Sequence, residues 1–266
     1  MFDLTNKVVV ITGGTGVLGS AIVRGLNQFG AKIAILGRNA QTGQALADEQ
    51  RDAVFVSCDV LDKAGIQQAS QIVLDKWGMV NALINGAGGN RADATVTTQT
   101  PFFDLPLEAI QHIFNLNFMG TFLTAQIFGK IMANQQHGVI LNISSMSAMR
   151  PLSRVVTYGN AKAALDNLTQ WLAVHFATVY SPNLRVNAIA PGFFLTEQNR
   201  YLLVDPSDPN MLTPRGQTII THTPMGRFGE PDDLIGTVVW LLSEASKFVT
   251  GVVVPVDGGF SVNSGI

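Results

Sequence analysis

Residues 7–19, KVVVITGGTGVLG, join an apolar run rich in valine to a glycine-rich turn, and this stretch decides the fold class. The next residues, 20–30 (SAIVRGLNQFG), have the apolar spacing of an amphipathic helix. A glycine turn between a strand and a helix lets backbone N–H groups approach a phosphate closely, at the positive end of the helix dipole. The stretch therefore predicts a strand, turn and helix that bind the pyrophosphate of a dinucleotide.

The glycines of this turn can be read in three registers. Gly14, Gly16 and Gly19 fit the general dinucleotide pattern G-x-G-x-x-G. Two other patterns begin at Gly13. One, T-G-x-x-x-G-x-G, would need glycine where Val17 stands, whereas the other, T-G-x-x-G-x-x-G, is complete.

Short β-branched runs alternate with segments of helical period along the rest of the chain. The further strand-like runs are 31–37, 53–59, 81–88, 138–145, 184–192 and 252–259, and the helical segments include 41–50, 64–78 and 158–180. This alternation predicts an α/β fold, a Rossmann-like doubly wound parallel sheet of about seven strands with helices on both faces. No linker divides the chain. We expect one domain, 1–266, with a cofactor half at roughly 1–140 and a catalytic and substrate half at roughly 141–266.

Composition excludes several classes of protein. The 266 residues are 47% hydrophobic and 14% charged, which allows one large core. A net charge of −2 without a block of Lys or Arg gives no general attraction to nucleic acid. The single cysteine, Cys58, cannot form an intrachain disulfide, and no His, Asp or Glu spacing indicates a metal site. A single cysteine is typical of a reducing compartment, and the apolar N-terminal run is too short to span a bilayer, so we expect a cytoplasmic protein with no membrane partner.

The end of the second strand bears on the choice of nicotinamide cofactor. An acidic residue there would bind the ribose 2′-hydroxyl of NAD, but the chain has Gly37 and Arg38. A guanidinium can hold a 2′-phosphate with bidentate hydrogen bonds. We therefore expect NADP(H) to be slightly favoured and NAD(H) to be possible, since Arg38 could also be a solvated loop residue or stack on adenine.

Four polar residues could carry catalysis. Tyr158 and Lys162 lie four positions apart in a helical segment and share one face. A phenol, with an ordinary pKa near 10, carries protons poorly at neutral pH unless nearby positive charge favours its anion, and Lys162 could supply that charge. Ser145 ends a strand, where its hydroxyl could donate to a carbonyl oxygen as charge grows there. Asn117 lies in a helical stretch, FNLNFMGTF.

Taken together, these segments resemble the classical branch of the short-chain dehydrogenase/reductase family over nearly the whole chain. The matching pieces are TGGTGVLG (12–19), CDV (58–60), NGAG (85–88), NLNFMG (115–120), YGNAK (158–162), PGFFLT (191–196) and VDGG (256–259). The resemblance implies that Tyr158 is the acid/base and that Lys162 binds the nicotinamide ribose and lowers the tyrosine pKa. It also implies that Ser145 polarises the carbonyl and that Asn117 holds a water linking the lysine to solvent.

The same resemblance implies a set of cofactor contacts. Asp59 and Val60 would contact adenine, Asn85 would support the central sheet and the adenosine ribose, and residues 189–196 would lie beside the nicotinamide. In the glycine turn, we interpret Gly16 as a displaced middle glycine. The residues expected at the cofactor are Gly13, Thr15, Gly16, Val17, Leu18, Arg38, Asp59, Val60, Asn85, Ala87, Gly88, Tyr158, Lys162, Pro191, Gly192, Phe194 and Thr196.

Substrate class is indicated by a narrower resemblance. The segments 86–95, 169–177 and 187–200 look like the D-mannonate oxidoreductase (fructuronate reductase) type. That resemblance implies hydride transfer between nicotinamide and a sugar acid, most simply D-fructuronate and D-mannonate, in a homotetramer built on helix faces. Members of that type are often described with NAD(H), so both cofactors stay open. The alternatives are a reductase of 5-ketogluconate or a 3-oxoacyl substrate, or a dinucleotide-sensing protein without turnover.

A sugar acid needs a cation for its carboxylate and partners for its hydroxyls. Two stretches without clear period, 89–103 and 193–223, are expected to line the substrate cleft. The candidates in or beside them are Arg154, Arg91, Arg200 and Asn90, with Asn199 and His222 as further hydroxyl partners. Arg154 is the first choice, since it lies four residues before Tyr158, although each candidate could equally be a solvated side chain. His175 is expected to be packed or at an interface.

Overall fold

A seven-stranded parallel sheet forms the centre of the computed structural model, which describes residues 1–196, 199–205, 207–208 and 211–265. The strand order is β3-β2-β1-β4-β5-β6-β7. The strands are β1 (Val8–Thr12), β2 (Lys32–Gly37), β3 (Ala53–Ser57), β4 (Ala82–Asn85), β5 (Gly138–Ile143), β6 (Leu184–Pro191) and β7 (Val253–Val256). The order reverses between β1 and β4, which confirms the expected doubly wound Rossmann-like sheet of seven strands.

The central strands are almost continuously apolar because helices cover both of their faces. Every residue of β1, β4 and β6 is buried. The register aligns Thr12 of β1 with Leu36 of β2 and with Asn85 of β4, and it aligns Asn85 with Asn142 of β5. The carboxyl ends of these strands therefore meet at one edge of the sheet.

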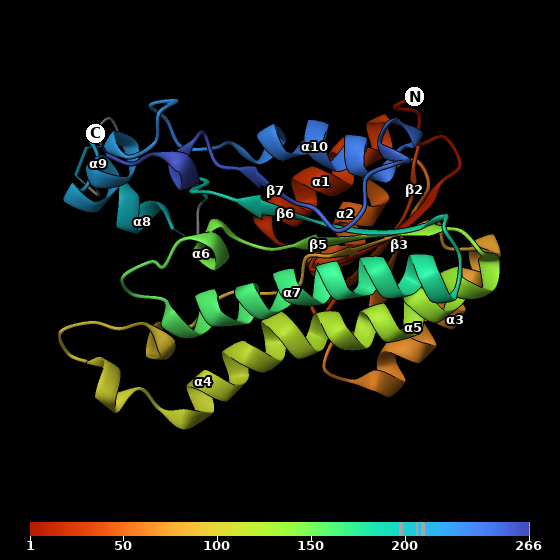
Figure 1. The fold of residues 1–266 in the computed structure, drawn as a ribbon, viewed down its shortest axis with the longest axis horizontal. Coiled ribbons are helices and arrows are strands. Elements are labelled where there is room, and N and C mark those ends of the chain that lie inside the picture. Colours follow the sequence, from red (N-terminus) through yellow and green to blue (C-terminus); the bar gives the residue numbers. More distant parts are fainter. Residues whose placement is uncertain (197–198, 206, 209–210, 266) are drawn as a thin grey trace.

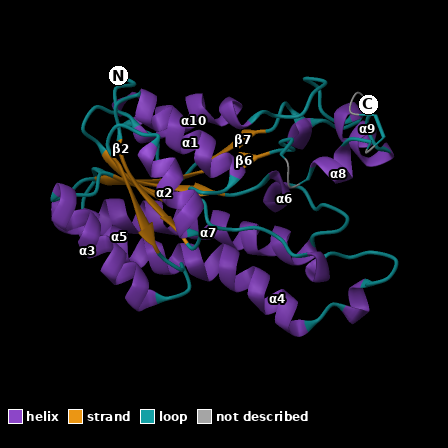
Figure 2. Ribbon diagram, turned by 180° about the vertical axis from the view of Figure 1, so that it is seen from behind, coloured by secondary structure: helices purple, strands orange, loops and turns teal. Residues whose placement is uncertain are grey.

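Helices form a layer on each face of the sheet (Figures 1 and 2). One layer contains α1 (Val17–Gln28), α2 (Ala40–Asp48) and α10 (Ile235–Leu242), and the other contains α3 (Lys63–Trp77), α5 (Gly120–Gln135) and α7 (Val156–Val179). A separate cluster of buried aliphatic side chains lies under each layer. Each fully buried Val, Leu or Ile contributes about 1.5–3 kcal/mol, so these clusters fix the helices on the sheet. Within the described residues, no helix is long and apolar enough to cross a membrane.

Short helices lie beyond the carboxyl ends of the strands, at the left of Figure 1. They include α4 (Leu107–Phe114), α6 (Met146–Met149), α8 (Arg200–Leu203) and α9 (Pro214–Thr221). Leu203, Val204 and Ile219 form a small apolar cluster of their own, separate from the two clusters at the sheet. The aperiodic stretch 193–223 thus contains two short helices that pack on each other at the edge of the sheet.

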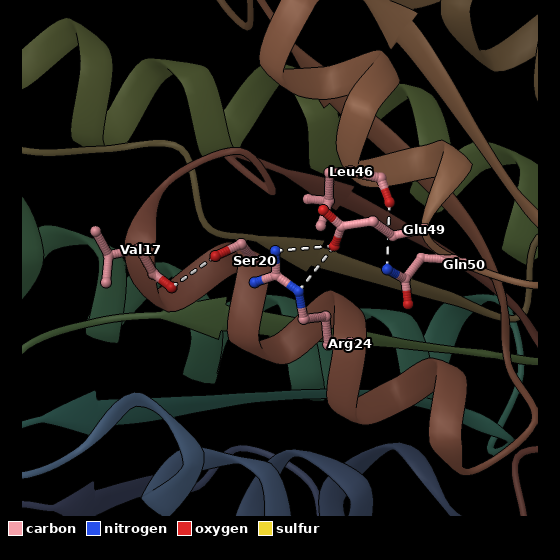
Figure 3. Close-up of polar contacts among 6 residues, drawn as sticks. All are labelled: Val17, Ser20, Arg24, Leu46, Glu49 and Gln50. Carbon is pink, nitrogen blue, oxygen red and sulfur yellow. Dashed lines mark hydrogen bonds and ion pairs between the residues drawn. The ribbon is translucent and has the colours of Figure 1, made fainter.

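The position of the glycine-rich turn is determined by the buried face of α1, which follows it, and not by the polar contacts of that helix. Ile22, Val23 and Leu26 bury one face of this helix. Figure 3 shows the polar contacts on the outer side, where Arg24 donates from Nε and Nη2 to Glu49 Oε2 at 3.1 and 3.0 Å. Both of these side chains are about half exposed, so the pair adds at most about 1 kcal/mol.

Candidate active site

A cavity of about 540 Å³ runs along the carboxyl ends of the strands. Every residue expected at the cofactor lines it except Asn85. The cavity extends from the glycine turn after β1 to Ser145, Tyr158 and Lys162. It therefore joins the expected dinucleotide site to the expected catalytic groups in a single space.

The glycines of the turn serve different purposes. Gly13 has φ +67°, and a Cβ there would lie 2.7 Å from the backbone of Gly86 and Ala87. A Cβ on Gly19 would collide with the carbonyl oxygen of Gly13. Gly16 has an ordinary φ of −74°, and the nearest atom to an added Cβ lies 3.4 Å away. The fold thus requires glycine at 13 and 19, whereas at 16 the free space belongs to the cavity, as close approach of a phosphate would require.

The N-terminus of α1 opens onto the same cavity. Gly16 is its N-cap and provides no side-chain hydrogen bond. Val17, Leu18 and Gly19, which form the first turn, line the cavity, and their N–H groups have no partner within the helix. These unsatisfied donors and the helix dipole favour an anion. The turn therefore fits the pyrophosphate of a dinucleotide.

Arg38 marks the far end of the cavity. It follows β2 directly, is exposed and lines the cavity. No ion pair joins its guanidinium to a carboxylate in the described part of the chain. Asp59 and Val60, which follow β3, line the cavity as well. The arrangement leaves a cation at the position where a ribose 2′-substituent is read in this kind of sheet.

The catalytic candidates come from β5 and α7. Lys162 Nζ lies 5.6 Å from the centre of the Tyr158 ring and donates to the carbonyl oxygen of Ile143 at 2.7 Å. Ser145 follows β5 as the N-cap of α6, where its Oγ accepts hydrogen bonds from the Ser147 backbone N–H at 3.2 Å and from Ser147 Oγ at 3.0 Å. These contacts fix a hydroxyl, a phenol and an ammonium group at one end of the cavity.

Burial dominates the proton affinities of this cluster. Burial raises the pKa of Tyr158, and the Ser145 hydroxyl opposes this shift by hydrogen bonding. Burial lowers the pKa of Lys162 to about 8, while the charge of Asp166 raises it. The lowered tyrosine pKa that the family resemblance implies stays a prediction.

Asn117 occupies a π-helical turn, η3 (Asn115–Met119), between α4 and α5. It is fully buried, and its Nδ2 donates to the carbonyl oxygens of Gly89 and Ile113, both at 2.8 Å. Its Oδ1 accepts from the Gly89 N–H at 3.0 Å. A Cβ on Gly88 would lie 2.6 Å from this Oδ1 and 3.2 Å from Lys162 Nζ. The asparagine therefore holds the turn beside Lys162, and its role in binding water stays a prediction.

The side chain of Asn85 supports the sheet, and its expected contact with the adenosine ribose stays a prediction. Asn85 is buried within the sheet, where its Nδ2 donates to Asn142 Oδ1 at 2.9 Å and its Oδ1 accepts from Thr124 Oγ1 at 2.7 Å. Both ends of its amide are used within the sheet, and Asn85 is not among the residues that line the cavity.

Polar side chains of the loop 89–103 bond to one another. Arg91 forms an ion pair with Asp93, with Nε donating to Oδ1 at 2.9 Å, and Asn90 Nδ2 donates to Thr95 Oγ1 at 2.8 Å. Neither Arg91 nor Asn90 lines the cavity. Arg91 is thus paired with a carboxylate two residues away, and its expected role at the substrate stays a prediction.

The other substrate candidates lie in different surroundings. Arg154 is exposed, and its backbone carbonyl accepts from the Val96 N–H at 2.9 Å. Arg200 begins α8, directly after Asn199, which lines the cavity. The Asn199 side chain is itself bonded to the backbone of residues 194 and 196, and His222 Nδ1 lies 2.8 Å from the Thr218 carbonyl oxygen.

Two further charged residues were not expected from the sequence. Arg215 lies on α9, within an aperiodic stretch that offers no pattern to identify it. Asp166 follows Lys162 by one helical turn, so the i, i+4 spacing that links Tyr158 to Lys162 could have identified it. No group of three or more His, Cys, Asp or Glu side chains that could hold a metal ion occurs among the described residues.

Known proteins align with this chain over its whole length. Residues 15–261 match a family model described as Enoyl-(Acyl carrier protein) reductase. A Bacillus subtilis (strain 168) protein called uncharacterized oxidoreductase UxuB is 47% identical over 277 residues, covering 99% of this chain and 98% of its own. A 2-dehydro-3-deoxy-D-gluconate 5-dehydrogenase from Formosa agariphila is 31% identical over 270 residues, covering 100% of this chain and 96% of its own.

A solved structure from Haemophilus influenzae, provisionally described as a D-mannonate oxidoreductase and containing bound NAD, is similar throughout. It is 42% identical, has a TM-score of 0.92, and covers 99% of this chain and 98% of its own. The likeness thus extends to a protein that holds a nicotinamide dinucleotide.

Proposed function

The chain belongs to the short-chain dehydrogenase/reductase family, and we propose that this NAD(P)-dependent oxidoreductase transfers a hydride between nicotinamide and a sugar acid. D-fructuronate and D-mannonate are the proposed substrate pair. The observation that carries the proposal is the single cavity, which is lined by Arg38 and Gly16 as well as by Ser145, Tyr158 and Lys162.

The fit of the cavity to a dinucleotide assigns a role to each end. The N–H groups at the start of α1 would hold the pyrophosphate, with Arg38 beside the adenosine ribose. Pro191, Gly192 and Thr196 would lie beside the nicotinamide. When it is bound, the nicotinamide supplies or accepts the hydride.

The side chains at the catalytic end would transfer a proton and stabilise the charges that form during the reaction. In the reducing direction the Tyr158 hydroxyl would give its proton to the substrate oxygen, and the Ser145 hydroxyl would donate a hydrogen bond to that oxygen. The ammonium of Lys162, 5.6 Å from the ring centre, would favour the phenolate that remains. In the oxidising direction the phenolate would take the proton back.

Two relatives favour a sugar acid as substrate. The Haemophilus influenzae structure is provisionally described as a D-mannonate oxidoreductase. The Formosa agariphila relative is named as a 5-dehydrogenase of 2-dehydro-3-deoxy-D-gluconate, which is a dehydrated gluconate. In D-fructuronate and in that gluconate, four carbon–carbon bonds separate the carboxylate carbon from the reacting carbon. The 5-ketogluconate alternative has the same spacing. The description of the matching family model favours an acyl thioester as a second candidate.

Oxidation of NADH and NADPH tests the proposal when it is measured with D-fructuronate, 5-ketogluconate and an acetoacetyl thioester. We expect turnover of a keto acid, and a loss of about 100- to 10,000-fold in Tyr158→Phe, the range for a missing general acid. Cofactor binding, measured by fluorescence, should survive in the variant. Full activity of Tyr158→Phe would remove the tyrosine from the mechanism. Turnover of the thioester but of neither keto acid would show that the substrate is an acyl thioester and not a sugar acid.

A further inference from the structure

A second cavity, of about 420 Å³, lies at the edge of the sheet opposite the candidate active site. It is lined by Lys7, Asn81, His137 and Asn183, which directly precede β1, β4, β5 and β6. The strands are parallel, so their amino ends share one edge of the sheet. His137 and Ser144 flank β5 and lie about 20 Å apart, since a strand rises about 3.3 Å per residue. A small ligand in this cavity therefore does not reach the catalytic groups.

Cationic side chains outnumber acidic ones around this cavity. Among the described residues that line it, Lys7, Arg185 and Lys247 are cations and Glu244 is the one carboxylate. Three positive charges against one negative leave an excess of two, although the whole chain has a net charge of −2. Burial and the charge of Lys7 lower the pKa of His137, against an opposing effect of Glu244, so the imidazole adds no charge at neutral pH. The local excess of positive charge favours an anion here.

The charge of Arg185 is buried. This residue is 8% exposed, and its Nη1 donates to the Leu241 carbonyl oxygen at 3.0 Å and to Ser246 Oγ at 3.1 Å. Its Nη2 donates to the Ser243 carbonyl oxygen at 3.3 Å. These acceptors are neutral, and no ion pair joins Arg185 to a carboxylate in the described part of the chain. Because water screens a buried charge less, Arg185 contributes positive potential to the cavity, although its donors are occupied.

Lys7 and Lys247 provide the donors that a ligand could use. Lys7 is half-buried, whereas Lys247 is exposed. The ion pairs within residues 1–196, 199–205, 207–208 and 211–265 include neither ammonium group. Each ammonium has three N–H donors, and a phosphate or carboxylate accepts such bonds with the added attraction of opposite charge. Two unpaired ammonium groups at one cavity thus fit an anionic group.

Phe248 presents an aromatic ring at the same cavity. It is 99% exposed although it lines the cavity, so its ring is not packed against the protein. Buried aliphatic side chains, among them Leu4, Val139 and Leu242, line the cavity as well. An apolar lining with a few charged groups is typical of small-molecule sites, in which the charged groups fix the orientation of the ligand. A flat ring could stack on Phe248 while an attached anionic group meets the lysines.

We propose that this cavity is a second ligand site, which binds a small organic anion that carries a flat ring. Aryl phosphates and aryl carboxylates share this chemistry. Lys7 and Lys247 hold the anionic group, the buried charge of Arg185 adds to the attraction, and the ring of the ligand stacks on Phe248. Because the site lies at the opposite edge of the sheet from Tyr158, its ligand takes no part in hydride transfer, and the inference is independent of the proposed substrate.

Isothermal titration calorimetry with three probes tests the site. Phenyl phosphate and benzoate combine a ring with an anionic group, whereas benzyl alcohol has the ring without the charge. At least one of the two anions should bind about tenfold or more tightly than benzyl alcohol, and the tighter anion identifies the preferred group as phosphate or carboxylate. In the double variant Lys7→Ala with Lys247→Ala, Kd for that anion should rise about 10- to 100-fold, the range for hydrogen bonds to charged groups.

Single variants at exposed positions keep the test independent of folding. Lys247→Ala should raise Kd for the preferred anion about two- to fivefold, the range for an exposed ion pair, and Phe248→Ala should raise it about two- to tenfold. Arg38→Ala is the matched control, because it removes an exposed cation from the other cavity, and it should leave Kd unchanged. Binding of neither anion above benzyl alcohol, or a Kd unchanged in both lysine variants, would overturn the site. A Kd that rises in Arg38→Ala but not in Lys247→Ala would place the probe in the candidate active site and overturn it as well.

Discussion

The ammonium group of Lys162 is buried, and the carboxylate that acts on it is that of Asp166, one turn further along α7. Asp166 Oδ1 and the nearby Ser144 Oγ are both buried, and hydrogen bonding from Ser144 opposes the rise that burial causes in the pKa of Asp166. Ser144 lines the cavity beside Ser145. The lysine charge therefore depends on a carboxylate that is itself poorly solvated, and burial raises the pKa of Asp166 in turn.

This environment predicts the alkaline limb of the pH profile. Burial lowers the Lys162 pKa to about 8, so the protonated fraction falls as pH rises through that value. Because the proposed role needs the charged form, kcat/KM should fall above about pH 8. Asp166 raises the lysine pKa, so Asp166→Asn should move the limb to lower pH.

A pH–rate profile of kcat/KM for the parent and Asp166→Asn checks this expectation. Asp48→Asn, on α2 and away from the cavity, is the matched control and should leave the limb in place. An alkaline limb that does not move in Asp166→Asn would contradict the assigned coupling.

Arg38 yields a prediction on cofactor choice. An aspartate at this position would repel a 2′-phosphate and accept hydrogen bonds from a ribose 2′-hydroxyl. Arg38→Asp should therefore lower the ratio of kcat/KM for NADPH to that for NADH by about 10- to 100-fold. Arg51→Asp makes the same charge change outside the cavity and should not alter the ratio. If the ratio is unchanged in Arg38→Asp, the guanidinium does not meet the 2′-phosphate, and the bound NAD of the Haemophilus influenzae structure becomes the better guide.

At the scale of elements, two glycines of the turn before α1 have different roles: the fold requires glycine at 19, whereas a bound ligand would require it at 16. A Cβ on Gly19 meets the Gly13 carbonyl, whereas a Cβ on Gly16 has space. Gly19→Ala should thus destabilise the protein by about 1–3 kcal/mol, the usual cost of overpacking. Gly16→Ala should leave the unfolding free energy within about 0.5 kcal/mol, yet raise KM for the cofactor by about tenfold or more, because its methyl group would occupy the space proposed for the pyrophosphate.

Urea unfolding and cofactor KM, measured on both variants, distinguish the two roles. Loss of stability in Gly16→Ala comparable to that in Gly19→Ala would mean that the fold, and not the ligand, selects glycine at 16. Unchanged cofactor KM in Gly16→Ala would place the pyrophosphate elsewhere in the cavity.

The sequence predicts the elements well where the signal is local. Strands such as Val8–Thr12 and Leu184–Pro191 are short apolar runs between turn residues, and their alternation with helical segments determines a parallel sheet. The π-helical turn at Asn115–Met119 was not predicted, because it adds one residue to a helical stretch without breaking the apolar pattern. The short helices at 200–203 and 214–221 were missed as well, since each is too short to show a period.

At the scale of the whole molecule, the sequence does not predict which segments that are distant along the chain come into contact. Tyr158 and Lys162 were identified because their spacing alone places them together. Asn117, by contrast, bonds to the backbone of Gly89, 28 residues away in the sequence, and no spacing records that contact. Conversely, Arg91 was expected at the substrate, but its pairing with Asp93 is a local contact that competes with that role.

The layer of helices that contains α7 leaves large apolar side chains uncovered. Trp171 is 57% exposed and Val174 is 67% exposed, and both lie on this helix. His175 stacks on Trp171 with ring centres 4.5 Å apart and meets Tyr180 edge-on at 5.4 Å, so it belongs to this surface and not to the cavity. Exposed apolar surface of this kind is typical of a protein–protein interface. It is where the homotetramer implied by the family resemblance would form.

Charge placed on this surface tests the assembly. We expect light scattering after size exclusion to give four chains for the parent and fewer for Trp171→Glu with Val174→Glu, because two carboxylates per chain would lose their hydration at the interface. Phe29→Glu, at the end of α1 in the other layer, is the control and should keep the parent mass. The far-ultraviolet circular dichroism of the double variant should match the parent, since neither side chain is part of the buried core. A double variant that keeps four chains would place the interface on another surface, whereas a parent that elutes as a single chain would show that the exposed tryptophan serves no assembly at all.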